Sequence, residues 1–382
     1  MKQIYILGNH IQALGISRIA KELGLKVTVF NSYKASVTRF SNSCDHFKLF
    51  KSHDDLLSQL KKAKEKDTLI MPTNDNLVHF ISENYEQLKK KYYISLPEPD
   101  IINICYNKIE TYKKAIDLGI PIPKSYFPSS LEHMNSFIHE LEYPLILKPA
   151  VMHTFHKKTG QKVFLCKSQE ELINNYHTLI NIIPPEQVII QEFLTGGAKS
   201  LFSFGSFFSN KKVFGSFIVN RIRQKPMDFG ISTCFAKSVI NKQIEEQSIK
   251  FLKGIDYFGL SEVEFMYDKK SNEYKLLEIN PRTWKWHSIS NILNINLIEM
   301  LINHIDNKPF DVQNNNLEDI AWIERVTDSY VSIKEIIKGK MTLKEYIITL
   351  KMPKENAVWS FKDPLPAIMY ILLLPYLFLK RN

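Results

Sequence analysis

SEVEFMYD (residues 261–268) and LLEINPR (residues 276–282) decide the fold of this chain. Both stretches are strand-like, and the polar residues 269–272 between them predict a turn, so together they indicate a β-hairpin. We expect Glu264 and Glu278 on one face at its centre, with Asn280 two residues further along the second strand. Charges inside apolar strands are costly without a partner, and Mg²⁺ prefers oxygen ligands. The hairpin therefore predicts a clamp for a metal ion and a triphosphate at Glu264, Glu278 and Asn280; a solvated hairpin with acidic outer residues is the alternative.

Three basic residues extend this hypothesis. Arg282 follows the second strand at once and would present a planar fork to a phosphate or a carboxylate. Lys148 ends the apolar run PLILKP, so its ammonium is expected to emerge at a strand end that points into a cleft. Lys108 begins a predicted helix, where a phosphate contact and a solvated surface lysine are equally compatible with the sequence.

Composition sets the broad class. The chain has 382 residues, of which 44% are apolar and 24% charged, as is typical of a folded protein with two or three domains. The net charge of +10 suits nucleic acid, an anionic membrane surface or a nucleotide equally, or reflects a general bias toward lysine. No compact basic and aromatic motif points to nucleic acid. The four cysteines form no CxxC pair, which argues against disulfides and zinc. The N-terminus lacks the pattern of a signal peptide, and we expect a cytoplasmic protein.

The chain is predicted to have α/β and α+β architecture in three parts. Residues 1–105 alternate strands and helices, which indicates a small parallel α/β domain. Its GNHIQALG segment is not a GxGxxG match, so we attribute Gly8 and Gly15 to tight chain reversal. Residues 106–312 are rich in predicted strands, and DVQNNNL (311–317) is a plausible linker into a helical segment, residues 313–382.

The order of these motifs resembles the ATP-grasp superfamily, particularly its carboxylate–amine ligases of the D-aspartate-ligase-like and cell-surface-polysaccharide-associated kinds. The matching features are Lys108, Lys148 in LKP, QEFLTGG at 191–197, VEF at 263–265 and EINPR at 278–282. The resemblance covers nearly all of residues 1–310, since the first 105 residues also look like the small α/β domain that precedes the ATP-grasp fold. The resemblance implies a small pre-ATP-grasp domain followed by a two-lobed ATP-grasp domain.

The resemblance also implies a role for each matched residue. Lys108 and Lys148 would contact the nucleotide phosphates, and Arg282 would stabilise the acyl phosphate. Glu264, Glu278 and Asn280 would hold one or two Mg²⁺ ions, for which Mn²⁺ is an alternative. The adenine pocket would be lined by four consecutive residues, namely Gln191, Glu192, Phe193 and Leu194.

Two segments depart from the pattern of the superfamily. Related ligases commonly carry acidic residues for the ribose after the adenine strand, whereas TGGAKS here has Ala198 and Lys199. The loop AVMHTFHKKTGQ (150–161) has one glycine where many relatives have a glycine-rich phosphate lid. Recognition of the ribose is therefore left open.

Arg221 and Arg223 lie in a segment that the resemblance places over the acceptor site. Paired arginines suit an acidic substrate, and arginines on an exposed strand face are the alternative. Trp284 and Trp286 follow the metal strand and either wall the substrate pocket or pack in the core.

The end of the chain is apolar. Residues 364–379 (PLPAIMYILLLPYLFL) carry no charge and precede Lys380 and Arg381, but they fall short of the roughly 20 residues that a spanning helix needs. We expect a shallow membrane contact at the inner face of the cell membrane; a helix buried on the protein or on a dimer partner is the alternative.

The sequence thus predicts an enzyme, a ligase that joins a carboxylate to an amine with ATP and Mg²⁺ through an acyl phosphate. We expect small-molecule substrates, acidic or lipid-linked, in cell-wall or surface-polysaccharide precursor synthesis, and no nucleic-acid partner. A homodimer is left open. The alternative is an inactive, ATP-binding scaffold or regulator at a membrane.

Overall fold

The computed structural model describes residues 1–151, 163–227, 230, 232–314 and 316–379. The chain forms two compact units. Unit 1 comprises Met1–Ile102, Gly197–Glu262 and Asn280–Asn382, and unit 2 comprises Asn103–Gly196 and Val263–Ile279. Each unit has buried apolar clusters of its own.

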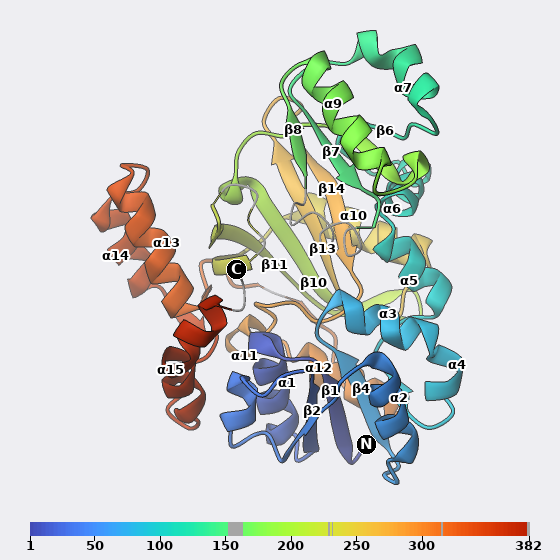
Figure 1. Cartoon of the computed structure of the whole chain (residues 1–382). Helices are drawn as coiled ribbons and strands as arrows, with labels where there is room; N and C mark the ends of the chain where they lie inside the picture. Colours follow the sequence, from blue (N-terminus) through green and yellow to red (C-terminus); the bar gives the residue numbers. More distant parts are fainter. Residues whose placement is uncertain (152–162, 228–229, 231, 315, 380–382) are drawn as a thin grey trace. The chain divides into compact units, whose positions relative to one another are not determined.

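The N-terminal part of unit 1 contains a five-stranded parallel sheet with the order β3-β2-β1-β4-β5 (blue in Figure 1). Its central strands are buried along their length, because parallel strands are covered on both faces by the helices that connect them. The strands are β1 (Gln3–Leu7), β2 (Lys26–Asn31), β3 (His46–Leu49), β4 (Thr68–Pro72) and β5 (Tyr93–Ile94). The connections contain α1 (His10–Glu22), the 3₁₀ helix η1 (Val37–Phe40), α2 (His53–Lys62), α3 (Asp75–Glu83) and α4 (Tyr85–Leu88), and α5 (Pro99–Tyr106) follows β5.

Gly8 makes the predicted tight reversal between β1 and α1. Its φ is +101°, and a Cβ at this position would lie 2.2 Å from the Thr73 hydroxyl oxygen, so only glycine fits. The structure therefore supports a steric role for Gly8, whereas Gly15 lies inside α1, so the chain reversal predicted there was wrong.

The second sheet carries the decisive hairpin. Its strand order is β14-β13-β10-β11-β12-β16-β17, and β15 pairs with β11. The strands are β10 (Leu201–Ser209), β11 (Lys212–Lys225), β12 (Ser232–Val239), β13 (Gly259–Asp268), β14 (Glu273–Asn280), β15 (Gln313–Asn314), β16 (Ala321–Ile323) and β17 (Lys354–Asn356). β13 ends and β14 begins on either side of residues 269–272, so the predicted turn is confirmed. The segment predicted as a linker contains β15, which pairs in parallel with residues 215–216 of β11.

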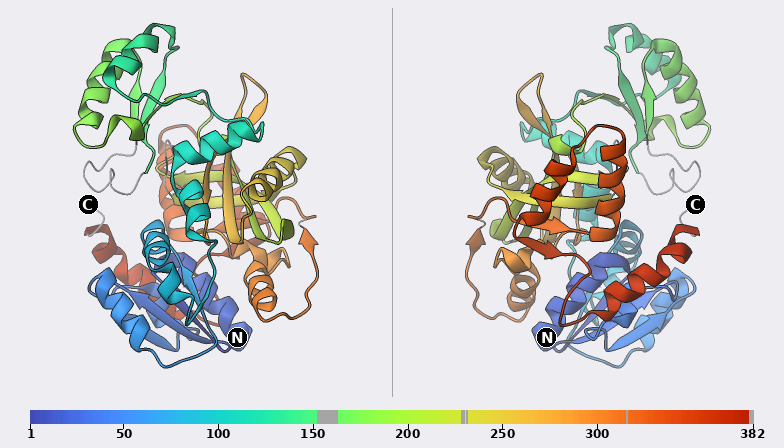
Figure 2. Two further views of the ribbon diagram at one scale, coloured as in Figure 1. Left: turned by 90° about the vertical axis from the view of Figure 1, so that its right-hand side faces the viewer. Right: turned by 90° about the vertical axis from the view of Figure 1, so that its left-hand side faces the viewer.

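Unit 2 contains a four-stranded sheet with the order β6-β9-β7-β8. Two helices, α7 and α9, pack on one side of it and form a single apolar core with β7 and β9 (Figure 2). The strands are β6 (Ser125–Tyr126), β7 (Leu145–Pro149), β8 (Phe164–Cys166) and β9 (Val188–Glu192). The helices are α6 (Lys108–Asp117), α7 (Leu131–Phe137) and α9 (Gln169–Ile180), with 3₁₀ turns η2 (Ile138–Glu140) and η3 (Pro185–Gln187).

The rest of unit 1 is helical. It comprises the 3₁₀ turn η4 (Ala198–Ser200), α10 (Lys242–Gly254), α11 (Ile289–Ile292), α12 (Leu297–Ile305), α13 (Arg325–Ile337), α14 (Leu343–Lys351) and α15 (Leu365–Leu379). None of the helices in the described ranges combines the length and the apolar character needed to cross a membrane. The predicted fold class, a parallel α/β domain followed by an ATP-grasp-like antiparallel sheet and a helical tail, is confirmed; the boundaries at 105 and 312 stay predictions.

Candidate active site

Lys108 is the first residue of α6, in unit 2, and it faces the hairpin. The Asn107 side chain accepts a hydrogen bond from the Ile109 amide at 3.0 Å and so begins the helix at this point. The Lys108 ammonium forms an ion pair with the Glu278 carboxylate, and only 12% of the lysine side chain is exposed. Lys108 is therefore not a solvated surface lysine, which was one of the two alternatives for this residue.

A second carboxylate acts on the same ammonium. Glu264, on β13, is 8% exposed, and its charge as well as that of Glu278 favours the charged form of Lys108. Burial by itself lowers the pKa of Lys108, but Glu278, the neighbouring Tyr112 and Glu264 together outweigh it, so the pKa is raised. Glu264 and Glu278 thus both act on Lys108; their role as metal ligands on one face of the hairpin stays a prediction.

Lys148 lies in β7 and is held by neutral oxygens. Its ammonium donates to the Tyr112 hydroxyl and to the Gln191 side-chain oxygen, each at 2.8 Å, and it is 7% exposed. Burial lowers the pKa of Lys148, and the neighbouring charge of Lys108 adds to this effect, while Tyr112 opposes it. An anionic ligand would therefore stabilise the charged form of Lys148.

Tyr112 was not predicted as a site residue. It lies on α6, one turn after Lys108, and its hydroxyl donates to the Leu277 carbonyl on β14 at 3.0 Å. The spacing of four residues between Lys108 and Tyr112 places both side chains on one side of the helix. This spacing is the feature of the sequence from which Tyr112 could have been predicted as a neighbour of Lys108.

The predicted adenine segment forms the end of β9. Gln191 is buried and donates to the Ser125 hydroxyl at 2.7 Å, in addition to its contact with Lys148. The Glu192 carboxylate accepts from the Lys124 amide at 2.8 Å and pairs with Lys275 at 2.6 Å. Phe193 and Leu194 follow and are half-buried. The side chain of Glu192 therefore orders the strand ends around it, and the adenine-binding role of these four residues stays a prediction.

In unit 1, Asn280 and Arg282 belong to one hydrogen-bonded chain. Asn280 donates to the Glu262 carboxylate and accepts from the Arg282 guanidinium, each at 3.1 Å. Arg282 also pairs with Asp75, the first residue of α3, at 2.6 Å. This network holds the guanidinium beside the carboxyl end of β4, the edge where open α/β sheets bind their ligands.

Arg221 reaches the same network through Glu262. The guanidinium donates to the Glu262 carboxylate at 3.0 Å and to the Ser203 hydroxyl at 3.1 Å, and both Arg221 and Glu262 are buried. Glu262 was not predicted, although the alternation in SEVEF places it on the same face of β13 as Glu264.

Arg223 points elsewhere. It pairs with Asp328 of α13 at 2.7 Å and donates to the Thr349 hydroxyl at 3.1 Å, and its guanidinium lies over the Phe235 ring. Both charged side chains are at least 97% buried, since their exposed fractions are 3% and 0%. The two arginines that the sequence grouped are therefore separated by the structure, and only Arg221 joins Asn280 and Arg282.

Trp284 and Trp286 belong to the core of unit 1. Both are at most 2% exposed, and they pack on each other and on Phe217. A Cβ on Gly205 would lie 2.2 Å from the Trp284 ring. Only glycine at this position of β10 therefore allows the indole to pack here. Of the two alternatives for these tryptophans, core packing holds.

Glu264, Glu278 and Asn280 carry the oxygen donors that Mg²⁺ prefers, and their role as its ligands stays a prediction. The described residues contain no group of three or more His, Cys, Asp and Glu that would hold a metal alone. Glu264 and Glu278 nevertheless converge on one buried cation, Lys108, which shows that this corner of unit 2 accommodates positive charge. Hard oxygen donors of this kind, completed by phosphate oxygens, are typical Mg²⁺ ligands. Residues 152–161 of the loop that takes the place of the phosphate lid lie outside the described residues.

Comparisons with known proteins agree with this geometry. Residues 221–303 match the family described as carbamoyl-phosphate synthase L chain, ATP binding domain. The chain is similar to the D-aspartate ligase of Enterococcus faecium, with 22% identity over 335 residues, covering 80% of this chain and 77% of the relative.

Two solved structures share the fold. N5-carboxyaminoimidazole synthetase from Staphylococcus aureus complexed with ADP has a TM-score of 0.67 at 16% identity, covering 89% of this chain and 87% of that one. The biotin carboxylase domain of Hydrogenobacter thermophilus 2-oxoglutarate carboxylase, in complex with MgADP, ADP and bicarbonate, has a TM-score of 0.65 at 16% identity, covering 81% and 71%. The first of these structures holds ADP and the second holds MgADP, which agrees with the predicted cofactors, ATP and Mg²⁺. The motifs of the hairpin, the strand order and these relatives agree with one another: the chain has the fold of ATP-grasp enzymes, and residues 221–303 match an ATP-binding domain family.

Proposed function

We propose that this protein is an ADP-forming, Mg²⁺-dependent ligase that activates a carboxylate with ATP and joins it to an amine. The observation that carries the proposal is the grouping in unit 2 of two lysines and two glutamates around the centre of the hairpin. Phosphoryl transfer needs positioning and neutralised charge more than it needs a protein nucleophile. This group of residues supplies both.

In the proposed reaction a carboxylate oxygen attacks the γ-phosphorus of ATP, and ADP leaves. The amine nitrogen then attacks the carbonyl carbon of the acyl phosphate, the bond to phosphate breaks, and the nitrogen loses a proton as the amide forms. Bound Mg²⁺ would supply charge neutralisation at the phosphate oxygens.

The residues of the chain have distinct parts in this scheme. Lys148 would bind phosphate oxygens, since its partners in the structure are neutral. Lys108 would exchange its pair with Glu278 for a phosphate, which leaves Glu278 and Glu264 to hold the metal. Asn280, two residues along β14 from Glu278, would join them, and Arg282 would stabilise the acyl phosphate. Arg221 would act on the acceptor only through Glu262 and the network that it shares with Asn280.

The first carboxylates to test are amino dicarboxylates, because the curated relative is named D-aspartate ligase. The role in cell-wall or surface-polysaccharide precursor synthesis and the location at the cytoplasmic face of a membrane stay predictions. Identification of the ligation product would test the role in precursor synthesis.

The decisive experiment measures phosphate release from ATP and Mg²⁺ by the purified protein with pooled carboxylates, D-aspartate included, and pooled amines. We expect release that requires both an acid and an amine, with a loss on the order of 100-fold or more in Glu278→Gln. Glu273→Gln, on the same strand, is the matched control and should retain activity. Tight binding of ATP without turnover in any pool would instead favour the scaffold or regulator.

A further inference from the structure

The C-terminal helices of unit 1 expose an unusual amount of apolar surface. Of the eighteen exposed large apolar side chains among the described residues, twelve lie between Tyr330 and Leu372. Phe361 is 90% exposed, Ile337 81% and Leu372 65%. Apolar residues scattered singly over a surface need no explanation, but such a concentration in one segment indicates an interaction surface.

The helix α15 covers only part of its own apolar surface. It packs against η1, and its Ala367 and Tyr370 contact the core of unit 1. Its outer side consists of Leu365, Ile368, Ile371 and Leu372, which are 47–65% exposed. These positions recur every three or four residues and therefore form one stripe along the helix.

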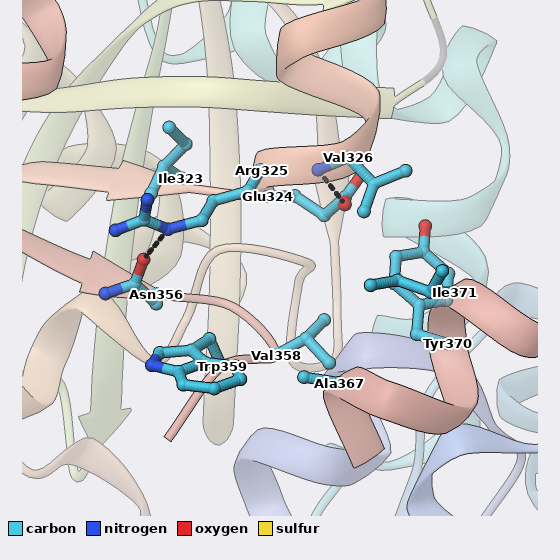
Figure 3. A pocket seen from close by; sticks show the side chains of 10 residues that line it. All are labelled: Ile323, Glu324, Arg325, Val326, Asn356, Val358, Trp359, Ala367, Tyr370 and Ile371. Carbon is cyan, nitrogen blue, oxygen red and sulfur yellow. Dashed lines mark hydrogen bonds between the residues drawn. The ribbon is translucent and has the colours of Figure 1, made fainter. Parts of the chain in front are cut away.

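A hollow lies where α15 meets the start of α13 (Figure 3). Its volume is about 270 Å³, and Val358, Trp359, Ala367, Tyr370 and Ile371 line its apolar side. On its polar side Arg325 donates to the Asn356 side chain at 2.6 Å. The hollow is therefore an apolar depression with both a cation, Arg325, and a carboxylate, Glu324, in its lining, and Ile371 belongs both to it and to the exposed stripe of α15.

The segment that carries this surface is predominantly basic. The segment from Arg325 to Asn382 contains ten Lys and Arg but five Asp and Glu. Four of these five acids are buried or half-buried; Asp328, for example, pairs with Arg223 inside the protein. The fifth, Glu345, is exposed but serves the capping box of α14. Six of the lysines are exposed, namely Lys334, Lys338, Lys340, Lys344, Lys351 and Lys362.

We propose that residues 325–379 bind the surface of an anionic phospholipid bilayer, with the outer stripe of α15 and the Trp359–Phe361 pair entering the headgroup region. Interfacial binding of this kind scales with buried apolar area and with the attraction of lysines to anionic lipid. The 15 residues of α15 suit a position in the plane of the interface better than a span, which needs roughly 20. A second copy of the chain is a poorer occupant, because a two-fold contact would oppose two basic faces.

Trp359 reports on this binding directly. The chain has four tryptophans, of which Trp284, Trp286 and Trp322 are at most 2% exposed, whereas Trp359 is 40% exposed. We expect vesicles of phosphatidylcholine with phosphatidylglycerol to bind the full chain in a flotation assay and to shift its tryptophan emission to the blue. Pure phosphatidylcholine vesicles should bind far more weakly, and the Trp359→Phe variant should lose the shift while it still floats.

Two sets of exposed substitutions separate the apolar from the electrostatic contribution. Phe361→Ser with Ile371→Ser and Leu372→Ser should weaken vesicle binding at least tenfold. Lys334→Gln with Lys338→Gln and Lys344→Gln should weaken it on the order of 100-fold, at roughly fivefold for each lysine.

The controls have matched chemistry and exposure. Ile116→Ser with Ile240→Ser removes apolar side chains that are 55% and 57% exposed. Lys211→Gln with Lys242→Gln and Lys270→Gln removes three exposed lysines elsewhere. If the control sets weaken binding as much as the test sets, or if anionic vesicles do not bind the full chain, the proposal is wrong. A dimer in lipid-free solution that the Phe361/Ile371/Leu372 variant converts to monomer would also overturn it, in favour of a second copy on this face.

Discussion

Lys108 and Lys148 are neighbouring lysines whose surroundings differ in charge. Carboxylates raise the pKa of Lys108, against the effect of its burial, whereas burial lowers the pKa of Lys148 beside neutral partners. The charge of Lys108 is therefore neutralised without a ligand, whereas the charged form of Lys148 would be stabilised most by a bound phosphate. The Tyr112 hydroxyl is the group that counteracts the low pKa of Lys148.

Tyr112→Phe tests this dependence. The tyrosine raises the pKa of Lys148, so its removal lowers that pKa further, and the ammonium loses its proton at a lower pH. We expect the alkaline loss of MgATP affinity to move to lower pH, with KM for ATP raised more than kcat is lowered.

The measurement is the pH profile of KM and kcat for ATP. Tyr267→Phe, near the end of β13 in the same unit, is the control, since its hydroxyl donates to the Asn272 side chain of the turn. An unchanged alkaline limb in Tyr112→Phe would show that the tyrosine does not tune Lys148.

At the scale of elements, the pair of Arg223 and Asp328 joins β11 to α13. Burial raises the pKa of Asp328 in spite of the nearby guanidinium, which shows how strongly the site is desolvated. Removal of one member of such a pair leaves a buried charge without its partner. Arg223 is accordingly expected to stabilise the packing of α13 on the sheet.

Asp328→Asn should lower the free energy of unfolding by about 3–5 kcal/mol. Arg223→Met combined with Asp328→Leu should cost much less, because no buried charge then remains. Chemical denaturation measures both values.

The exposed pair Lys237–Asp319 provides the comparison, and Asp319→Asn should cost about 1 kcal/mol or less. If Asp328→Asn were as stable as the wild type but failed to bind the acceptor, the sequence-based role of Arg223 in substrate binding would gain support.

At the scale of the whole molecule, nucleotide and metal are expected to stabilise the fold together. A ligand that binds the folded state at 100 times its Kd adds about 2.7 kcal/mol to the free energy of unfolding. MgADP should therefore raise Tm, and ADP with a chelator should raise it much less, since the metal that Glu264 and Glu278 are proposed to hold is then absent.

Thermal unfolding of Lys108→Met and of Lys113→Met checks this expectation. Both lysines lie on α6, but the Lys113 side chain is 59% exposed, so only Lys108→Met should lose the stabilisation. Equal shifts in both variants would exclude Lys108 from the nucleotide site.

The sequence by itself determined the elements and the motif. The alternation in SEVEFMYD and LLEINPR placed β13, β14 and their turn, and QEF marked the end of β9, because such patterns depend on neighbours a few residues away. Family resemblance then supplied the site residues. The tertiary structure alone decided their partners. Lys108 pairs with Glu278, which lies 170 residues away in the sequence, and Arg223 pairs with Asp328, which lies 105 residues away and outside the predicted site. No local pattern encodes these pairings, since they depend on how buried elements pack and on the cost of leaving a charge without a partner.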